Sequence, residues 1–399
     1  MNILLFEDNN YKNFGPLTKL RPVHELRTGI YSILQKYQKL MPDDNFYFYH
    51  RAKFNSRYKE ENLELFRAMD DEEFVAVNSR IIPDNNLVKY IELMKNNKAK
   101  YSKDEENNLL CGIFQNKKQF KTTYTKKISN TIVPKFKMIC YPWDLVNYNG
   151  SEIVSDLKYK TAEQGWINKD PENVILTGRN NIYIKKSAKI RAGVIIDASE
   201  GPVVIDENAD IMHNSVIIGP AYIGRGSVVK IGSKIYENTS VGEVCKVGGE
   251  IEGSIIHGYS NKQHDGFLGH AYIAEWCNLG ADTNNSDLKN NYSNVKVEIN
   301  GKLIDTGSMF VGLIMGDHSK TGINTMFNTG TVVGVGCNVY GEGFPERNIP
   351  DFHWGGKGKL TRYPFKRTIA TMETVMKRRN KDLSKNDLKI LEKIYLNCK

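Results

Sequence analysis

Between Ile205 and Val247 an aliphatic, β-branched residue occurs at every sixth position. These residues are Ile205, Ile211, Ile217, Ile223, Val229, Ile235, Val241 and Val247. A period of six matches neither the α-helix nor one long strand, in which every second side chain points inward. It predicts short strands joined by tight turns, each strand placing one aliphatic side chain in a common core. We therefore predict a parallel β-solenoid in the C-terminal half.

Shorter sets extend this repeat on both sides. The earlier set is Ile184, Ile190 and Ile196, displaced by three residues near "SEG", and the later sets are Phe267, Ile273 and Leu279, and Phe327, Val333 and Val339. The stretch from residue 254 to residue 282 interrupts the repeat. It contains three histidines, His257, His264 and His270, among glycines and polar residues.

The N-terminal half is predicted to be an α/β domain. "NILLF" (2–6) and "EFVAVN" (73–78) are strand-like, and residues 23–40 place Leu26, Ile30, Ile33, Leu34 and Tyr37 on one helical face. Lys19, Arg21 and Arg27 follow the first strand and enter that predicted helix. Guanidinium groups beside a helix N-terminus suit phosphate binding, and surface ion pairing is the alternative.

Composition and pattern divide the chain into four parts. We predict an α/β domain over 1–165, a polar linker over 166–181, the solenoid over 182–345 and a helical tail over 346–399. In the tail, Ile369, Met372, Val375 and Met376 form an apolar stripe. "SKND" before "LKILEKIYL" is typical of a capped helix start.

The net charge of +9 suits anionic ligands such as nucleotides, sugar phosphates and coenzyme A. A general preference for Lys and Asn in this chain explains the charge equally well. The charge is dispersed, so we expect no nucleic-acid partner. No run of about 18 apolar residues suggests a membrane span. The six scattered cysteines and the first ten residues, which do not resemble a signal peptide, favour a cytoplasmic protein.

The six-residue repeat resembles that of the hexapeptide-repeat acyltransferases, which are left-handed parallel β-helices and usually trimers with active sites between subunits. Five other segments carry a second resemblance: "PLTKLRPVHELRTGI", "VNSRIIPD", "WDLVNYN", "GYSNKQHDGFLG" and "EWCNLGADTNNSDLKNNY". Together they resemble a divergent bacterial sugar nucleotidyltransferase family. That family is similar to the bifunctional UDP-N-acetylglucosamine pyrophosphorylase/glucosamine-1-phosphate acetyltransferase. The resemblance implies a nucleotidyltransferase-like domain followed by the β-helix.

The resemblance implies roles for particular residues. "HDGFLG" matches the acetyltransferase pattern His-x-x-Tyr-Leu-Gly, which makes His264 the base and puts Phe267 in the place of the tyrosine. "NLGADT" assigns Asn278 to the sugar phosphate and the backbone of Ala281 to the acyl donor, acetyl-CoA. The remaining sugar-phosphate residues it implies are Arg191, Asn291 and Tyr292. The lysine of the family falls near Glu252 here, so Lys246 or Lys262 would replace it.

The histidines allow two other interpretations. Three of them suggest zinc, but spacings of seven and six place them on neighbouring strands rather than on neighbouring coils, which disfavours a shared ion. The second alternative is that the three histidines are polar loop residues without a chemical role. Histidine side chains as a class exchange protons near neutral pH, which suits a general base.

The N-terminal half departs from the pyrophosphorylase pattern at one point. The family's Gly-Asp, whose aspartate binds Mg²⁺, is replaced by Ser79 and Arg80 after the strand "EFVAVN". Asp84 or Asp144 is a candidate replacement ligand. The family resemblance implies an enzyme that acetylates glucosamine 1-phosphate and then joins it to UTP with Mg²⁺. The alternative is nucleotidyl transfer alone, from UTP or dTTP to a hexose 1-phosphate, with the β-helix as an oligomerisation scaffold.

Overall fold

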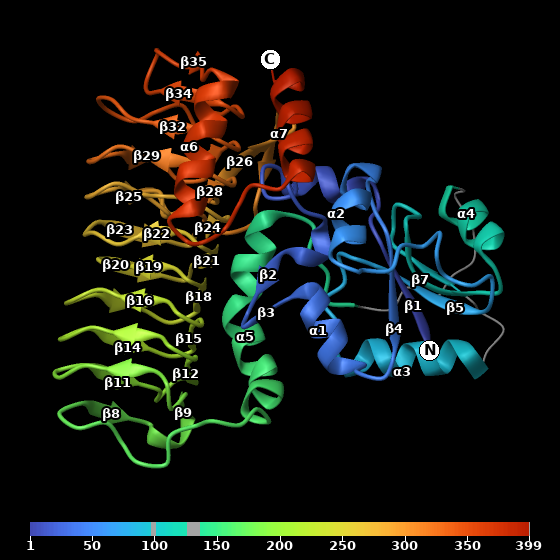
Figure 1. Cartoon of the computed structure of the whole chain (residues 1–399), viewed down its shortest axis with the longest axis horizontal. Coiled ribbons are helices and arrows are strands. Elements are labelled where there is room, and N and C mark those ends of the chain that lie inside the picture. The colour runs from blue at the N-terminus through green and yellow to red at the C-terminus, as the bar shows by residue number, and fades with distance from the viewer. Residues whose placement is uncertain (97–100, 126–135, 399) are drawn as a thin grey trace. The chain divides into compact units, whose positions relative to one another are not determined.

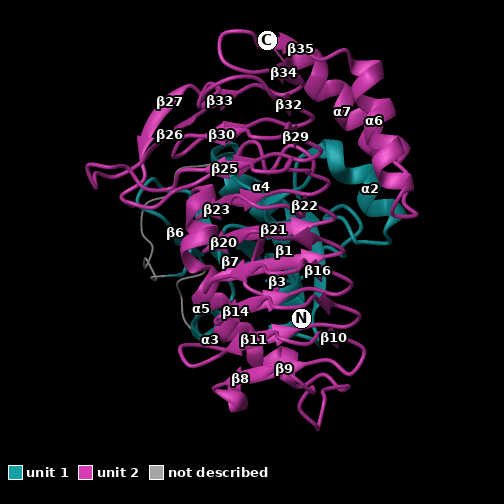
Figure 2. Ribbon diagram, turned by 90° about the vertical axis from the view of Figure 1, so that its left-hand side faces the viewer, with its two compact units in different colours: residues 1–14, 21–26, 31–140 teal, residues 15–20, 27–30, 141–399 magenta. Residues whose placement is uncertain are grey.

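A computed structural model describes residues 1–96, 101–125 and 136–398. The chain forms two compact units (Figure 2). Unit 1 comprises residues 1–14, 21–26 and 31–140, and unit 2 comprises residues 15–20, 27–30 and 141–399. Two short N-terminal segments thus belong to the second unit, although they precede most of the first in sequence.

Unit 1 is built on a five-stranded sheet in the order β4-β1-β5-β7-β6. Its strands are β1 (Asn2–Phe6), β4 (Asn45–Tyr49), β5 (Phe74–Asn78), β6 (Tyr101–Lys103) and β7 (Leu109–Phe114). β1 pairs with β4 and β5 in parallel, whereas β7 is antiparallel to both of its neighbours. Both predicted strands are confirmed, and buried aromatic side chains such as Phe6, Phe74 and Phe120 fill the core on one face.

The helix predicted over residues 23–40 is wrong in its first half. Only α1 (Ile33–Leu40) is α-helical, and its N-cap is Ser32. Gly29 has a φ of +75°, and a side chain there would lie 2.6 Å from Asp156 Oδ2. The Gly29 backbone N–H instead donates to Asn149 Oδ1 at 2.7 Å, so this segment is tied to a helix of unit 2. Glycine and these tertiary hydrogen bonds override the helical spacing of the apolar residues.

The remaining helices of unit 1 are α2 (Asn55–Glu60), α3 (Asn85–Asn96) and α4 (Lys117–Thr125). Unit 2 contributes α5 (Pro142–Thr161), α6 (Phe365–Lys377) and α7 (Lys385–Asn397). Ser384 caps α7 by accepting from the Asp387 N–H at 3.0 Å, as the sequence predicts. Among the described residues, no helix is both long and apolar enough to cross a membrane.

Unit 2 is a parallel β-solenoid whose strands form three faces, which we call A, B and C. One turn of the chain around the solenoid is called a rung, and Figure 1 shows the rungs stacked on one another. Face A contains β10 (Lys189–Ile190), β13 (Asp210–Ile211), β16 (Val228–Val229), β19 (Lys246–Val247) and β22 (Asn261–Lys262). Face B contains β8 (Ile175–Thr177), β11 (Ile195–Asp197), β14 (Val216–Ile218), β17 (Lys234–Ile235), β20 (Glu250–Glu252) and β23 (Phe267–Gly269). Face C contains β9 (Ile182–Ile184), β12 (Val203–Ile205), β15 (Ala221–Ile223), β18 (Thr239–Glu243), β21 (Ile255–Gly258), β24 (Tyr272–Ile273), β28 (Ile314–Met315), β31 (Val332–Val333) and β33 (Asn348–Ile349).

The rungs towards the C-terminal end of the solenoid, which we call the upper rungs, continue these faces with shorter strand ladders. Bridges from Asn261 to Asn278 and from Asn278 to Lys320 extend face A to β29 (Lys320–Thr321), β32 (Asn338–Val339), β34 (His353–Gly355) and β35 (Thr361–Arg362). β25 (Asn284–Asn285) and β30 (Met326–Phe327) form another pair, and β26 (Lys296–Ile299) and β27 (Lys302–Asp305) form a hairpin inserted between rungs.

The six-residue repeat sets the register of the solenoid. Ile205 aligns with Ile223 and Val241 on face C, and Ile211 aligns with Val229 on face A. The eight residues of the repeat from Ile205 to Val247 are at most 1% exposed and line one core. Three steps of six therefore make one rung, and the predicted parallel solenoid is confirmed.

Two features of this core differ from the prediction. Ile251 pairs with Leu268, so Leu268 rather than Phe267 occupies the inward position. Lys262 pairs with Val247 and points inward where the repeat expects an aliphatic residue. Two elements are placed differently from the predicted division: β8 lies within residues 166–181, which were expected to be a linker, and α5 belongs to unit 2.

Candidate functional site

The three histidines lie on different sides of the solenoid. His257 is in β21 on face C, His264 lies in the turn from face A to face B, and His270 lies in the turn from face B to face C. His257 Nδ1 is 3.0 Å from Glu275 Oε1, and His270 Nδ1 is 2.8 Å from Asp287 Oδ2. The described residues contain no cluster of three or more ligating side chains that would hold a metal ion. The shared zinc site is therefore excluded by this arrangement.

His264 projects from an exposed turn between β22 and β23. The turn of the next rung stacks on it, because the Asp282 N–H donates to the Asp265 carbonyl at 3.1 Å. Ala281 is aligned with His264 in this stack, and rungs are about 4.8 Å apart. The structure thus brings His264 and Ala281 together at one corner, with Asn278 on the strand position that leads into the upper turn.

Asn278 belongs to a chain of polar side chains on the outer side of face A. Asn261 Nδ2 donates to Asn278 Oδ1 at 3.3 Å, and Arg379 donates to Asn261 Oδ1 at 3.1 Å. Asn278 also aligns with Lys320 in the rung above. The predicted sugar-phosphate residue Asn278 is therefore part of a polar row that extends along the axis of the solenoid beside the His264 turn.

Asn291 and Tyr292 lie in the insertion that follows this turn. Tyr292 is 69% exposed, and Asn291 Oδ1 accepts from the backbone N–H and the hydroxyl group of Ser293. The insertion is anchored to the solenoid by His270, whose ring stacks on Phe310 at 5.0 Å between centroids. Among the described residues, neither Asn291 nor Tyr292 is hydrogen-bonded to His264.

Arg191 lies far from His264. It directly follows β10, four rungs before β22 on the same face, and four rungs span roughly 19 Å. Its guanidinium group is paired with Asp210 through two hydrogen bonds of 3.0 Å. Within one chain, a sugar phosphate held near His264 does not reach Arg191.

Lys262 is the lysine closest in sequence to His264, and it is 1% exposed. Its ammonium group donates to the backbone carbonyls of Gly248 and Asp265 at 3.3 and 3.0 Å and to the carbonyl of His264. These three acceptors use its three protons. Lys262 therefore holds the turn that carries His264 and does not reach a substrate, so it does not replace the family's lysine at the phosphate.

Burial lowers the pKa of Lys262 to about 8. An unfolded lysine titrates near 10.4, so between these values the unfolded state binds more protons and stability rises with pH. We expect wild-type protein to gain about 2 kcal/mol relative to Lys262→Met between pH 7 and pH 9.5. Urea unfolding of both proteins at the two pH values measures this difference, and a gap that is the same at both would contradict the assignment.

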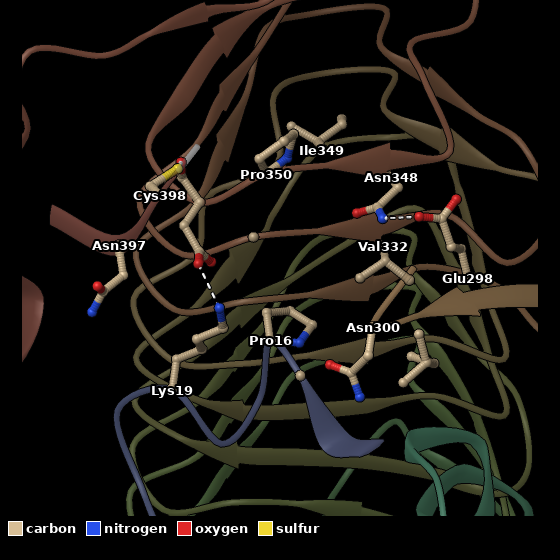
Figure 3. Close-up of a pocket in the computed structure, with 14 residues that line it drawn as sticks. Pro16, Lys19, Glu298, Asn300, Val332, Asn348, Ile349, Pro350, Asn397 and Cys398 are labelled. Atoms are coloured by element: carbon tan, nitrogen blue, oxygen red, sulfur yellow. Dashed lines mark hydrogen bonds and ion pairs between the residues drawn. The ribbon is translucent and has the colours of Figure 1, made fainter. Parts of the chain in front are cut away.

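The predicted phosphate residues Lys19, Arg21 and Arg27 are separated between the units. Lys19 and Arg27 belong to unit 2 and Arg21 belongs to unit 1. Arg27 is buried and pairs with Glu243 at 2.9 Å. Lys19 Nζ lies 2.6 Å from Asp351 Oδ2, at the edge of a pocket of about 390 Å³ that Figure 3 shows.

The carboxyl ends of the parallel strands in unit 1 carry a different group of charged residues. Glu7 and Asp8 follow β1, Arg51 follows β4 and Arg80 follows β5. The Arg51 guanidinium group donates to both oxygens of Glu7 at 3.0 Å, and Arg80 donates to Asp8 at 2.6 to 3.2 Å. Open α/β sheets bind ligands at this edge. Sequence reasoning named Arg80 only as a departure from the family pattern and missed the other three residues, although two acids directly after the first strand were a visible signal.

Two histidines, the buried His24 and the half-buried His50, lie beside this edge. His24 contacts Tyr58 Oη at 2.5 Å and Ser79 Oγ at 3.3 Å. Burial lowers the pKa of His24 well below its usual range and lowers the pKa of His50 to about 4. Both imidazoles are therefore neutral near pH 7, and the positive charge at this edge comes from arginine.

The predicted Mg²⁺ finds no fitting ligand set in the described residues. Asp84 caps α3 by accepting from the Leu87 N–H at 2.9 Å, and Asp144 caps α5 by accepting from the Tyr141 N–H at 2.9 Å. Glu7 and Asp8, the acids at the strand ends, are each held by an arginine. A magnesium site needs carboxylate oxygens that are available to the ion, so these residues as arranged do not provide one.

Residues 3–164 match the family model described as "Sugar nucleotidyl transferase". A bifunctional sugar-1-phosphate nucleotidylyltransferase/acetyltransferase from Sulfurisphaera tokodaii is 34% identical over 152 residues, 38% of this chain and 38% of that protein. The bifunctional protein GlmU of Methanocaldococcus jannaschii is 31% identical over 189 residues, 44% of this chain and 42% of that protein. The chain thus spans less than half the length of these two relatives. The resemblance drawn from the sequence is confirmed by these matches.

Solved structures align with this chain only loosely. A UDP-N-acetylglucosamine acyltransferase from Bacteroides fragilis aligns with 58% of this chain and 98% of its own at 12% identity, with a TM-score of 0.27. An N-acyltransferase from Bacillus cereus in complex with dTDP and coenzyme A aligns with 54% of this chain and 100% of its own at 13% identity, with a TM-score of 0.21. The solenoid is established by its own strand pairing rather than by these alignments.

Proposed function

We propose that this chain, whose N-terminal segment matches the sugar nucleotidyl transferase family, is a bifunctional enzyme of nucleotide-sugar synthesis. Its solenoid would transfer acetyl from acetyl-CoA to the amine of glucosamine 1-phosphate. Its N-terminal unit would then join the product to UTP with release of pyrophosphate. The observation that carries the acetyl-transfer half is the stacking of the His264 turn beneath the Ala281 turn, next to Asn278.

In the proposed acetyl transfer, the amine nitrogen of the sugar attacks the carbonyl carbon of the thioester. The C–N bond forms, the C–S bond breaks, and the coenzyme A sulfur leaves with the electron pair. His264 accepts the proton that the amine loses and returns it to the departing thiolate. The backbone at Ala281, one rung away, would contact the acyl donor. Asn278 supplies an amide to orient the sugar phosphate.

In the proposed nucleotidyl transfer, an oxygen of the sugar phosphate attacks the α-phosphorus of UTP and pyrophosphate leaves. The carboxyl ends of β1, β4 and β5 are the expected place for the nucleotide. Arg51 and Arg80 are fixed there by Glu7 and Asp8, and preorganised cations suit the charge that develops on phosphate. These two arginines take over the role that the sequence assigned to Lys19, Arg21 and Arg27.

Two separate assays test the two halves. Thiol release from acetyl-CoA that depends on glucosamine 1-phosphate reports acetyl transfer. Pyrophosphate release with a panel of nucleoside triphosphates and sugar 1-phosphates reports nucleotidyl transfer. Thiol release without any dependence on the sugar would contradict the acetyl-transfer proposal, and the absence of pyrophosphate across the panel would contradict the second half.

One observation favours the alternative function, nucleotidyl transfer alone with UTP or dTTP and a hexose 1-phosphate. His257 and His270 each contact a carboxylate, whereas His264 has no side-chain partner among the described residues to orient its ring. In that case the solenoid would assemble oligomers. We expect a homotrimer in the cytoplasm under either function, which light scattering after size-exclusion chromatography tests.

A further inference from the structure

Four cations gather on the outer side of face A. Lys246 lies in β19, and Lys230 directly follows β16 in the rung below. Arg378 and Arg379 directly follow the end of α6. Arg379 reaches Asn261, which aligns with Lys246 in the adjacent rung. We call Lys230, Lys246, Arg378 and Arg379 the basic cluster.

The length of α6 explains why its C-terminal end reaches the rung that contains Asn261. Met372 of α6 lies 3.0 Å from the position that a side chain at Gly336 would occupy, so the helix packs beside an upper rung. Its 13 residues span about 20 Å, close to four rungs of about 4.8 Å. Figure 1 shows α6 running along the upper rungs of the solenoid. The helix therefore delivers its last basic residues to the rung that leads into the His264 turn.

The positive charge of the basic cluster is not neutralised by acidic residues in the part of the chain that the structure describes. None of its four members forms an ion pair with a carboxylate among the described residues. Burial lowers the pKa of Lys246, and the charges of Arg379, Lys230 and Arg378 lower it further. Like charges held this close are unfavourable, and a bound anion relieves their repulsion.

We propose that the basic cluster binds phosphoryl groups of a substrate used at the His264 turn. Asn261 joins the cluster to Asn278, and its strand β22 ends two residues before His264. A ligand with one end at this turn and a phosphate on face A would contact both. This inference rests on the proposed acetyl transfer. The phosphate belongs either to coenzyme A or to the sugar 1-phosphate.

Calorimetric binding tests the cluster without requiring turnover. Coenzyme A, dephospho-coenzyme A and glucosamine 1-phosphate would be titrated into wild-type protein and into Arg378→Gln/Arg379→Gln. The matched control is Lys366→Gln/Arg367→Gln, which removes the same charge from exposed positions at the start of the same helix. Circular dichroism would confirm that all three proteins are folded.

We expect the cluster variant to bind at least one ligand roughly ten-fold more weakly or worse, and the control variant to bind as wild type does. Loss confined to coenzyme A assigns the phosphate to the acyl donor, and loss confined to glucosamine 1-phosphate assigns it to the sugar. Equal affinity of wild type and cluster variant for all ligands, or no binding by wild type, would overturn the proposal. Binding without thiol release would instead refute acetyl transfer and leave the anion site in place.

Discussion

Replacing His264 with alanine is expected to lower the rate of acetyl transfer by roughly 10²- to 10⁴-fold, the usual contribution of a general base. In the proposed reaction the imidazole accepts the proton of the attacking amine. Because the side chain is exposed, its removal leaves the solenoid core intact. Steady-state thiol release with saturating glucosamine 1-phosphate measures the change, which should appear in kcat.

His213→Ala is the matched control for this substitution. His213 is also exposed and occupies the equivalent corner position three rungs away, because Ile211, Val229, Val247 and Lys262 are aligned on face A. It should retain wild-type activity. Full activity in His264→Ala would remove this residue from the mechanism, and an equal loss in both variants would indicate a general effect on the solenoid.

Asp8→Asn is expected to destabilise unit 1 by about 3–5 kcal/mol, the cost of breaking a buried ion pair by removing one partner. Arg80 is 3% exposed and would be left charged and poorly paired. Chemical unfolding monitored by far-ultraviolet circular dichroism gives the free energy of unfolding. Asp43→Asn, at an exposed aspartate of the same unit, should change it by less than about 0.5 kcal/mol.

A double substitution separates the contribution of the Asp8–Arg80 ion pair to stability from the contributions of the two individual side chains. Asp8→Asn/Arg80→Leu removes both charges, so its cost should be smaller than the sum of the two single substitutions. Pyrophosphate release by the same variants reports on catalysis, because we also place Arg80 at the nucleotide. Simple additivity of the two stability losses would show that Asp8 and Arg80 do not depend on each other.

The repeat predicted the solenoid well because it is imposed by packing. An inward position admits only side chains that fill the core, so the period is visible in the sequence. Where another interaction fills that position the prediction failed: Lys262 replaces an aliphatic residue because three backbone carbonyls satisfy its ammonium group. The helix predicted over 23–40 failed for a similar reason, since Gly29 and the side chains of α5 hold the backbone in another conformation.

The candidate site was predicted in part. Local motif matching found His264, Ala281 and Asn278, which lie within two neighbouring rungs. It also selected Arg191, because a match to a short motif does not count the rungs that separate it from a second motif. The pairs Glu7–Arg51 and Asp8–Arg80 were missed because each joins the ends of two strands that are distant in sequence. Only strand order reveals such neighbours.

The central claim, that one chain carries both transferase sites, is tested by a single incubation. Wild-type protein would be mixed with acetyl-CoA, glucosamine 1-phosphate and UTP, and the products identified by mass spectrometry. We predict UDP-N-acetylglucosamine, with coenzyme A and pyrophosphate released in equal amounts, and no acetylated nucleotide sugar from His264→Ala. Pyrophosphate release without acetylated product would leave only nucleotidyl transfer, and the absence of both products from folded protein would contradict the account.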